Sequence, residues 1–256
     1  MSGHSKWASI KHKKAIVDAK KGKIFTRLAN AVSAAARQGG GDPDKNFRLR
    51  LALDQAKAAN MPAANIERAI KRGTGEGGGA KIEEIIYEGY GPGGTAILVE
   101  AATDNRNRTS SEVRSTFTKY GGSLGESGSV AYIFDKRGQV QLTLLRKATE
   151  GQAISALQLP REELELAIID SGAEDFEESE EEILVYTNPN KLMSVQSSLK
   201  EAGIKIDSAE LLYVPKMEVK ISDKEKAKKI LNLMDALEGL DDVASISTNA
   251  DIDIPE

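Results

Sequence analysis

Basic side chains gather at the start of the chain, and their type and spacing indicate phosphate chemistry. Within the first 27 residues only Asp18 carries a negative charge. Each cation near a phosphate displaces condensed counterions, so affinity for nucleic acid grows with the number of contacts and falls with salt. We therefore predict a nucleic-acid-binding surface made of the following residues: Lys6, Trp7, Lys11, His12, Lys13, Lys14, Lys20, Lys21, Lys23 and Arg27.

The composition of this basic cluster predicts weak sequence preference. Lysine predominates, and its ammonium group binds phosphate as a point charge. Direct reading of bases requires Arg, Asn or Gln at a groove edge. Trp7 offers a flat apolar face that can stack on a base or pack into a core of helices. The residues leave both interpretations of Trp7 open, and they do not choose between DNA and RNA.

A second candidate site lies in residues 103–109, where a predicted strand ends and a helix begins. Arg106 and Arg108 flank the helix start, whose free N–H groups favour anions. One interpretation is a contact to phosphate or to an acidic partner. The other is a capping turn, with Asp104 or Thr109 as the capping residue.

Other kinds of site lack their characteristic residues. The chain has no cysteine, which excludes disulfides, thiolate catalysis and cysteine-ligated zinc. Zinc sites use histidines closer together than His4 and His12, with further ligands. The glycine-rich stretches 73–79 and 89–94 do not have the GxxxxGK[ST] order of a phosphate loop. The acidic run 177–182 lacks the alternating loop of a calcium site, and we expect it to be a solvated loop.

These absences predict a protein that is not an enzyme and uses no metal, cofactor or small-molecule substrate. Two alternatives stay open at this point. An enzyme could be contained in the later part of the chain, because paired carboxylates meet only in the fold. That part could also be a protein-interaction module that binds a partner through its sheet.

Charge is distributed unevenly along the 256 residues. Residues 1–80 hold 16 Lys and Arg against 6 Asp and Glu, a net charge of +10, whereas residues 81–256 hold 19 against 33, a net charge of −14. This split predicts a nucleic-acid-binding module joined to an acidic body that directs polyanions to the basic end. No window reaches the roughly 20 apolar residues of a membrane helix, and the start lacks the apolar run of a signal peptide. We expect a cytoplasmic protein with no membrane partner.

The hydrophobic period changes along the chain, from helical to mixed. Two helices are expected at residues 8–20 and 23–38. A third is expected to start at the Asp42-Pro43-Asp44 step, and a fourth at Pro62. Strands 82–87, 95–102 and 130–134 surround a helix at 104–120. There follow a strand at 139–144, a helix at 161–171, two strands at 173–178 and 182–187, a helix at 191–202 and a strand at 205–214. A strand at 218–222, a helix at 224–238 and a strand at 243–248 complete the chain.

This order of elements predicts a multidomain fold of α and α+β parts. The middle segment reads βαββαβ, the ferredoxin-like arrangement. Neither flanking segment covers a sheet well alone, so we expect the two to combine. The expected domains are a basic helical domain at 1–80, a discontinuous α+β domain at 81–135 plus 215–256, and an inserted ferredoxin-like domain at 136–214.

Several ordered motifs carry a family resemblance over nearly the whole chain. They are Gly3-His4-Ser5-Lys6-Trp7, Lys23-Ile24-Phe25, Asn60-Met61-Pro62, Asn65-Ile66-Glu67-Arg68-Ala69-Ile70, Tyr87-Glu88-Gly89-Tyr90-Gly91-Pro92-Gly93-Gly94, Thr103-Asp104-Asn105-Arg106-Asn107-Arg108-Thr109 and Gly128-Ser129-Val130. Together they resemble the YebC/PmpR family, which includes the mitochondrial translational activator of cytochrome oxidase.

The resemblance implies a fold and two functions. It implies three domains, with the ferredoxin-like one inserted, and no catalysis, metal or cofactor. Bacterial members are commonly described as DNA-binding transcriptional regulators, and this is the function we expect. Other members act on the ribosome and help translation through proline-rich stretches. The alternative is therefore a ribosome-associated factor whose partner is ribosomal RNA.

Overall fold

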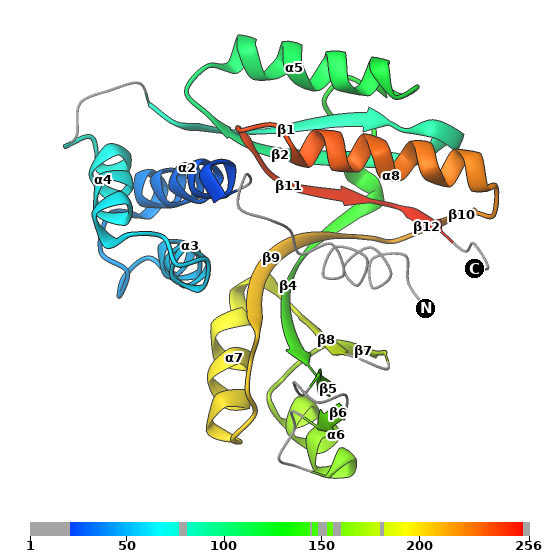
Figure 1. Ribbon diagram of the computed structural model, residues 1–256. Helices are drawn as coiled ribbons and strands as arrows, with labels where there is room; N and C mark the ends of the chain where they lie inside the picture. The colour runs from blue at the N-terminus through cyan, green and yellow to red at the C-terminus, as the bar shows by residue number, and fades with distance from the viewer. Residues whose placement is uncertain are drawn as a thin grey trace. The chain divides into compact units, whose positions relative to one another are not determined.

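The computed structural model describes residues 21–76, 81–143, 145–147, 153–155, 160–179 and 182–252. The helix expected at residues 8–20 lies outside these residues. The chain divides into two compact units (Figure 1). One consists of Asp135–Val214, and the other joins the residues up to Phe134 with those from Pro215 onward. The fold is the expected multidomain combination of an N-terminal helical part and α+β parts.

Three helices form the N-terminal part of the larger unit: α2 (Lys21–Gly39), α3 (Phe47–Ala58) and α4 (Ala63–Thr74). Their core is small and aliphatic, with Leu28, Val32, Leu49, Leu53 and Met61 as its larger members. Helix α4 packs closely on α2. A Cβ at Gly73 would lie 2.3 Å from the carbonyl oxygen of Ser33, so glycine is required at this crossing.

Helix α3 begins later than the sequence indicates. The Asp42-Pro43-Asp44 step predicts a start there, but the first helical residue is Phe47. The reason is Asn46, whose side-chain oxygen accepts from the Leu49 N–H at 3.1 Å and so caps the helix. Its amide donates to the carbonyl oxygens of Ala35 and Gly40, each at 2.8 Å. Asn46 therefore fixes the turn between α2 and α3.

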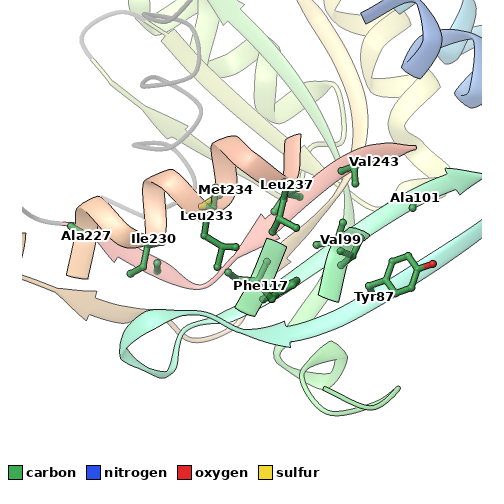
Figure 2. Close-up of a cluster of buried hydrophobic side chains, with 14 of the residues drawn as sticks. Tyr87, Val99, Ala101, Phe117, Ala227, Ile230, Leu233, Met234, Leu237 and Val243 are labelled. Atoms are coloured by element: carbon green, nitrogen blue, oxygen red, sulfur yellow. The ribbon is translucent and has the colours of Figure 1, made fainter. Parts of the chain in front are cut away.

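An antiparallel sheet lies beside these helices in the same unit. Its strands are β1 (Glu83–Tyr90), β2 (Ala96–Thr103), β3 (Ser123–Leu124) and β11 (Val243–Thr248), in the order β11-β2-β1-β3. Helices α5 (Arg106–Lys119) and α8 (Lys224–Glu238) pack on one face. The core between them joins Val99 of β2, Phe117 of α5 and Leu233 of α8 (Figure 2). Strands β10 (Val219–Ile221) and β12 (Ala250–Ile252) add a parallel pair.

Helix α2 packs against the sheet, and polar contacts attach the helices to it. Ala34 of α2 contacts Ala102 of β2 and the preceding Ile82 in a small apolar cluster. Arg48 forms an ion pair with Glu84 of β1 at 3.0 Å. Gln38 donates to the same carboxylate at 2.6 Å. The helices and the first strand are thus joined by both apolar and charged contacts.

The smaller unit has the ferredoxin-like arrangement predicted from the sequence. Its elements are β4 (Phe134–Thr143), α6 (Arg161–Asp170), β7 (Asp175–Glu178), β8 (Glu182–Thr187), α7 (Leu192–Glu201) and β9 (Ser208–Pro215). The strand order is β7-β8-β4-β9. The sequence pattern does not predict the short hairpin of β5 (Leu145–Lys147) and β6 (Ala153–Ser155). The acidic run is only partly described, and its Glu182 is buried in β8 instead of lying in a solvated loop.

The strand expected at residues 130–134 is wrong. Residues Ala131–Ile133 form a single 3-10 turn, and β4 begins only at Phe134. The cause is Glu88 of β1, which is buried. Its carboxylate accepts from the backbone N–H groups of Gly128, Val130 and Ala131 at 2.6, 2.8 and 2.7 Å. Donors that point at this carboxylate are not available to a strand ladder.

We predict that Glu88→Gln lowers the free energy of unfolding by about 1.5–3 kcal/mol at neutral pH, the value of charge-assisted hydrogen bonds. Burial acts to raise the pKa of Glu88, but the three N–H donors outweigh it and hold the pKa below the ordinary 4.5. The stabilisation is thus complete above 4.5 and is lost as the pH falls through the lower folded pKa. Urea titrations at several pH values measure it.

The matched control is Glu83→Gln, which removes an exposed carboxylate from the same strand. At neutral pH it should change the free energy of unfolding by less than about 0.5 kcal/mol, as surface substitutions generally do. Equal effects of the two substitutions would contradict a structural role for the Glu88 carboxylate.

Candidate nucleic-acid interface

The described part of the basic cluster lies on α2. Lys23 is exposed, and its ammonium group donates to the carbonyl oxygen of Gly239 at 3.0 Å, at the end of α8. Arg27 is half-buried one turn later. The other members of the cluster, together with the Lys21 side chain, lie outside the described residues. They are Lys6, Trp7, Lys11, His12, Lys13, Lys14 and Lys20.

The turn at residues 103–109 is capped, but not by the residues expected from the sequence. Asn105 is the N-cap of α5, and its side-chain oxygen accepts from the Arg108 N–H at 3.1 Å. Asp104 and Thr109, the expected caps, make other contacts. Thr109 donates through its hydroxyl to Asp242, which comes from the far end of the sequence.

Asp242 is the centre of this polar site. Its side chain is 7% exposed and lies just before β11. One carboxylate oxygen accepts from the hydroxyls of Thr103 and Thr109 at 2.9 and 2.6 Å, and from the Arg108 guanidinium at 2.6 Å. Burial acts to raise the pKa of Asp242. The hydrogen bonds from Arg108, Thr109 and Thr103 outweigh burial and lower it. The group is therefore a charged carboxylate at neutral pH, with one oxygen that accepts three hydrogen bonds.

Asp104 connects this site to the N-terminal helices. Its two carboxylate oxygens contact Arg108 at 3.1 Å and Arg72 of α4 at 3.0 Å. Arg72 also donates to the side-chain oxygen of Asn30 on α2, at 3.3 Å. We call this arrangement of Arg72, Asp104 and Arg108 the Asp104 bridge. Its three side chains are one-third to nearly one-half exposed, in contrast to Asp242.

The two predicted arginines therefore have different surroundings. Arg108 is held by Asp104 and Asp242, and the hydrogen bond to Asp242 is the largest cause of its raised pKa. Arg106 is exposed, and no ion pair joins it to any carboxylate of the described ranges. Arg72 is not among the residues predicted from the sequence. Arg72 lies in the last turn of α4, where a basic residue commonly stabilises the helix dipole. The sequence alone therefore gives no reason to assign it to a binding site.

The Asp104 bridge places Arg72 beside the turn that carries Arg106 and Arg108. Arg68 lies one turn before Arg72 on α4 and is exposed. Guanidinium groups present paired donors that match phosphate oxygens. This surface has the chemistry to bind phosphate, and Asp104 forms ion pairs with two of its arginines.

Neither a metal site nor a membrane span is found in the part of the chain that the structure describes. Among these residues, no group of three His, Asp or Glu side chains could hold a metal ion. No helix in the same ranges is both long and apolar enough to span a membrane.

Comparison with known proteins identifies relatives along the whole chain. Residues 5–76 match the model of the TACO1/YebC protein N-terminal domain, and residues 82–250 match that of the TACO1/YebC second and third domain. A relative from Desulfitobacterium hafniense is 49% identical over 97% of this chain and 95% of its own. One from Geotalea uraniireducens is 50% identical over 98% and 96%. Both are named probable transcriptional regulatory proteins.

A solved structure is similar over almost the same extent. The crystal structure of a conserved hypothetical protein from Aquifex aeolicus matches with a TM-score of 0.84 and 48% identity. The match covers 98% of this chain and 97% of that one. The similarity thus extends to the fold of nearly the full chain.

We predict that Asp242→Asn lowers the free energy of unfolding by about 1.5–3 kcal/mol at neutral pH, because it weakens three hydrogen bonds to a charged acceptor. The pKa of Asp242 is lowered from an ordinary 3.8. Its stabilisation is therefore present above pH 3.8 and disappears as the pH falls through the folded pKa. Chemical denaturation at a series of pH values measures this difference.

Asp241→Asn provides the control, since Asp241 is the exposed neighbour of Asp242. It changes the net charge identically and should cost less than about 0.5 kcal/mol, as for surface substitutions in general. A destabilisation as large as that of Asp242→Asn would argue against a special role for the buried carboxylate.

Proposed function

Since this chain belongs to the TACO1/YebC family, we propose that it is a non-enzymatic, nucleic-acid-binding regulator of gene expression in the cytoplasm, a DNA-binding transcriptional regulatory protein of the YebC type. The observation that supports this most is the segregation of charge. The first 80 residues carry +10 and the remainder −14. The names of the relatives, as probable transcriptional regulatory proteins, point in the same direction.

Charge segregation determines which end of the protein meets a polyanion. Phosphate contacts from Lys and Arg provide affinity and orient the protein, but carry no sequence information directly. The acidic remainder repels the same ligand. We propose that the basic cluster at the N-terminus makes the first contacts, and that Arg106 adds to them from the start of α5. Lys23 and Arg27 extend this surface along α2.

Ribosomal RNA is the alternative target. Lysine-rich surfaces bind structured RNA by shape and phosphate contacts, without base-edge readers. The scarcity of Arg, Asn and Gln in the first 27 residues favours such a ligand as much as it favours duplex DNA. In that case the protein would act as a ribosome-associated translation factor.

Ultraviolet crosslinking in living cells, followed by sequencing of the attached DNA and RNA, tests the proposal. Enrichment of promoter DNA over ribosomal RNA is the expected result. Enrichment of ribosomal RNA, with promoter DNA at background, would replace transcriptional regulation by the translational function. Background recovery of both would contradict nucleic-acid binding altogether.

We predict that replacing Lys11, Lys13 and Lys14 together by Ala weakens binding to every sequence tested. The slope of log affinity against log salt should fall by about one unit for each phosphate that the variant no longer neutralises. Fluorescence anisotropy with labelled duplex DNA and with structured RNA, over a series of salt concentrations, measures both quantities.

Replacing Lys224, Lys228 and Lys229 of α8 by Ala gives the control. These lysines are exposed, and their removal changes the net charge equally. An unchanged slope for the N-terminal variant, or an equal change in the α8 variant, would mean that the first three lysines do not contact phosphate.

A further inference from the structure

We propose that the Asp104 bridge is an autoinhibitory contact, in which Asp104 occupies the guanidinium of Arg72 until a nucleic-acid phosphate replaces it. Arg72 would then be a phosphate-binding residue of the protein, with Asp104 as its intramolecular competitor. This inference rests on the proposed function, since it requires that the ligand carries phosphates. It adds Arg72 of α4 to the binding surface. It also implies that Arg72 is available to phosphate only when Asp104 is displaced.

The geometry of Asp104 suits an exchangeable partner. Its carboxylate oxygens lie 3.0 Å from Arg72 and 3.1 Å from Arg108, within hydrogen-bond distance, and a phosphate offers the same guanidinium groups the same kind of acceptor. The Asp104 and Arg72 side chains are each one-third exposed, so the ligand can approach without unfolding. Ion pairs of this exposure contribute little to stability. The exchange therefore costs the protein little.

Arg72 stays in place when Asp104 is displaced. Its second terminal nitrogen donates to Asn30, which is buried at the α2–α4 contact. The close crossing at Gly73 fixes the backbone next to it. A guanidinium held in this way loses little freedom when it binds, and a preorganised group binds more tightly for that reason.

Arg108 is the contrasting member of the bridge. Its guanidinium lies 2.6 Å from Asp242, a buried carboxylate that no solvent anion reaches. Displacement of Asp104 therefore leaves Arg108 partly neutralised, whereas Arg72 loses its one ion pair among the described residues. This difference assigns the gain in phosphate affinity mainly to Arg72.

The experiment compares the affinity of the full-length protein and its variants for a labelled duplex DNA of mixed sequence, at several salt concentrations. Asp104→Asn should bind about threefold to fivefold more tightly at low salt, because one competing carboxylate is removed. Arg72→Ala should bind more weakly than wild type. In the Arg72→Ala background, the additional Asp104→Asn change should lose most of its effect.

Asp44→Asn is the matched control. Asp44 forms an ion pair with Arg50 at 3.2 Å, so its replacement removes the same charge and also frees one arginine of the helical part. It should change the affinity much less than Asp104→Asn. Thermal unfolding of each variant, monitored by circular dichroism, verifies that the fold is retained.

Three outcomes would overturn the inference. If Asp104→Asn binds no more tightly than Asp44→Asn, Asp104 is not a competitor. If Asp104→Asn increases the affinity as much in the Arg72→Ala background as in the wild type, Asp104 acts only through its general contribution to the net charge. If the wild-type protein binds neither this duplex nor structured RNA at low salt, the proposed function fails together with the inference.

Discussion

The buried Asp242 carboxylate is the interaction on which the geometry of the candidate interface depends. The carboxylate receives hydrogen bonds from the end of β2 and from the first turn of α5. The backbone carbonyl oxygen of Asp242 also accepts from the Ala102 N–H of β2 at 2.8 Å. A buried charge is tolerated only when donors replace the lost water. Because those donors come from β2 and α5, satisfying the charge fixes both beside β11, and the turn that carries Asp104 is fixed with them.

The three carboxylates of Glu88, Asp104 and Asp242 are stabilised in two kinds of surroundings, one buried and one partly exposed. Glu88 and Asp242 are buried and accept from fixed backbone, hydroxyl and guanidinium donors, which makes them part of the structure. Asp104 is partly exposed, and it forms its ion pairs with Arg72 and Arg108, whose side chains are themselves one-third to nearly one-half exposed. Exposure determines which of these contacts a soluble anion can replace, because water and ions screen exposed pairs far more than buried ones. The same donor chemistry thus serves folding in one place and is open to exchange in the other.

Among the described residues, two ion pairs join the helical part to the α+β part of the larger unit. Arg48 and Glu84 form one of them, and Arg72 and Asp104 form the other. The helices that follow the basic N-terminal residues are therefore connected to a turn far along the chain. The positive side chains of α2, α4 and the start of α5 thus belong to one compact unit, whose internal contacts fix their spacing.

Local patterns in the sequence determined most elements, because apolar periodicity and caps act within a few residues. Helix α8 and strand β11 have the bounds that periodicity predicts, and the βαββαβ order of the smaller unit follows from it as well. Only the tertiary structure decided what depends on distant partners. Glu88 changes residues 131–133 from a strand to a turn, and Arg72 meets Asp104 across 32 positions. Charge composition indicated a polyanion ligand, but the pairing of each charge depends on the fold, because an ion pair requires a distance and a burial that no sequence spacing specifies.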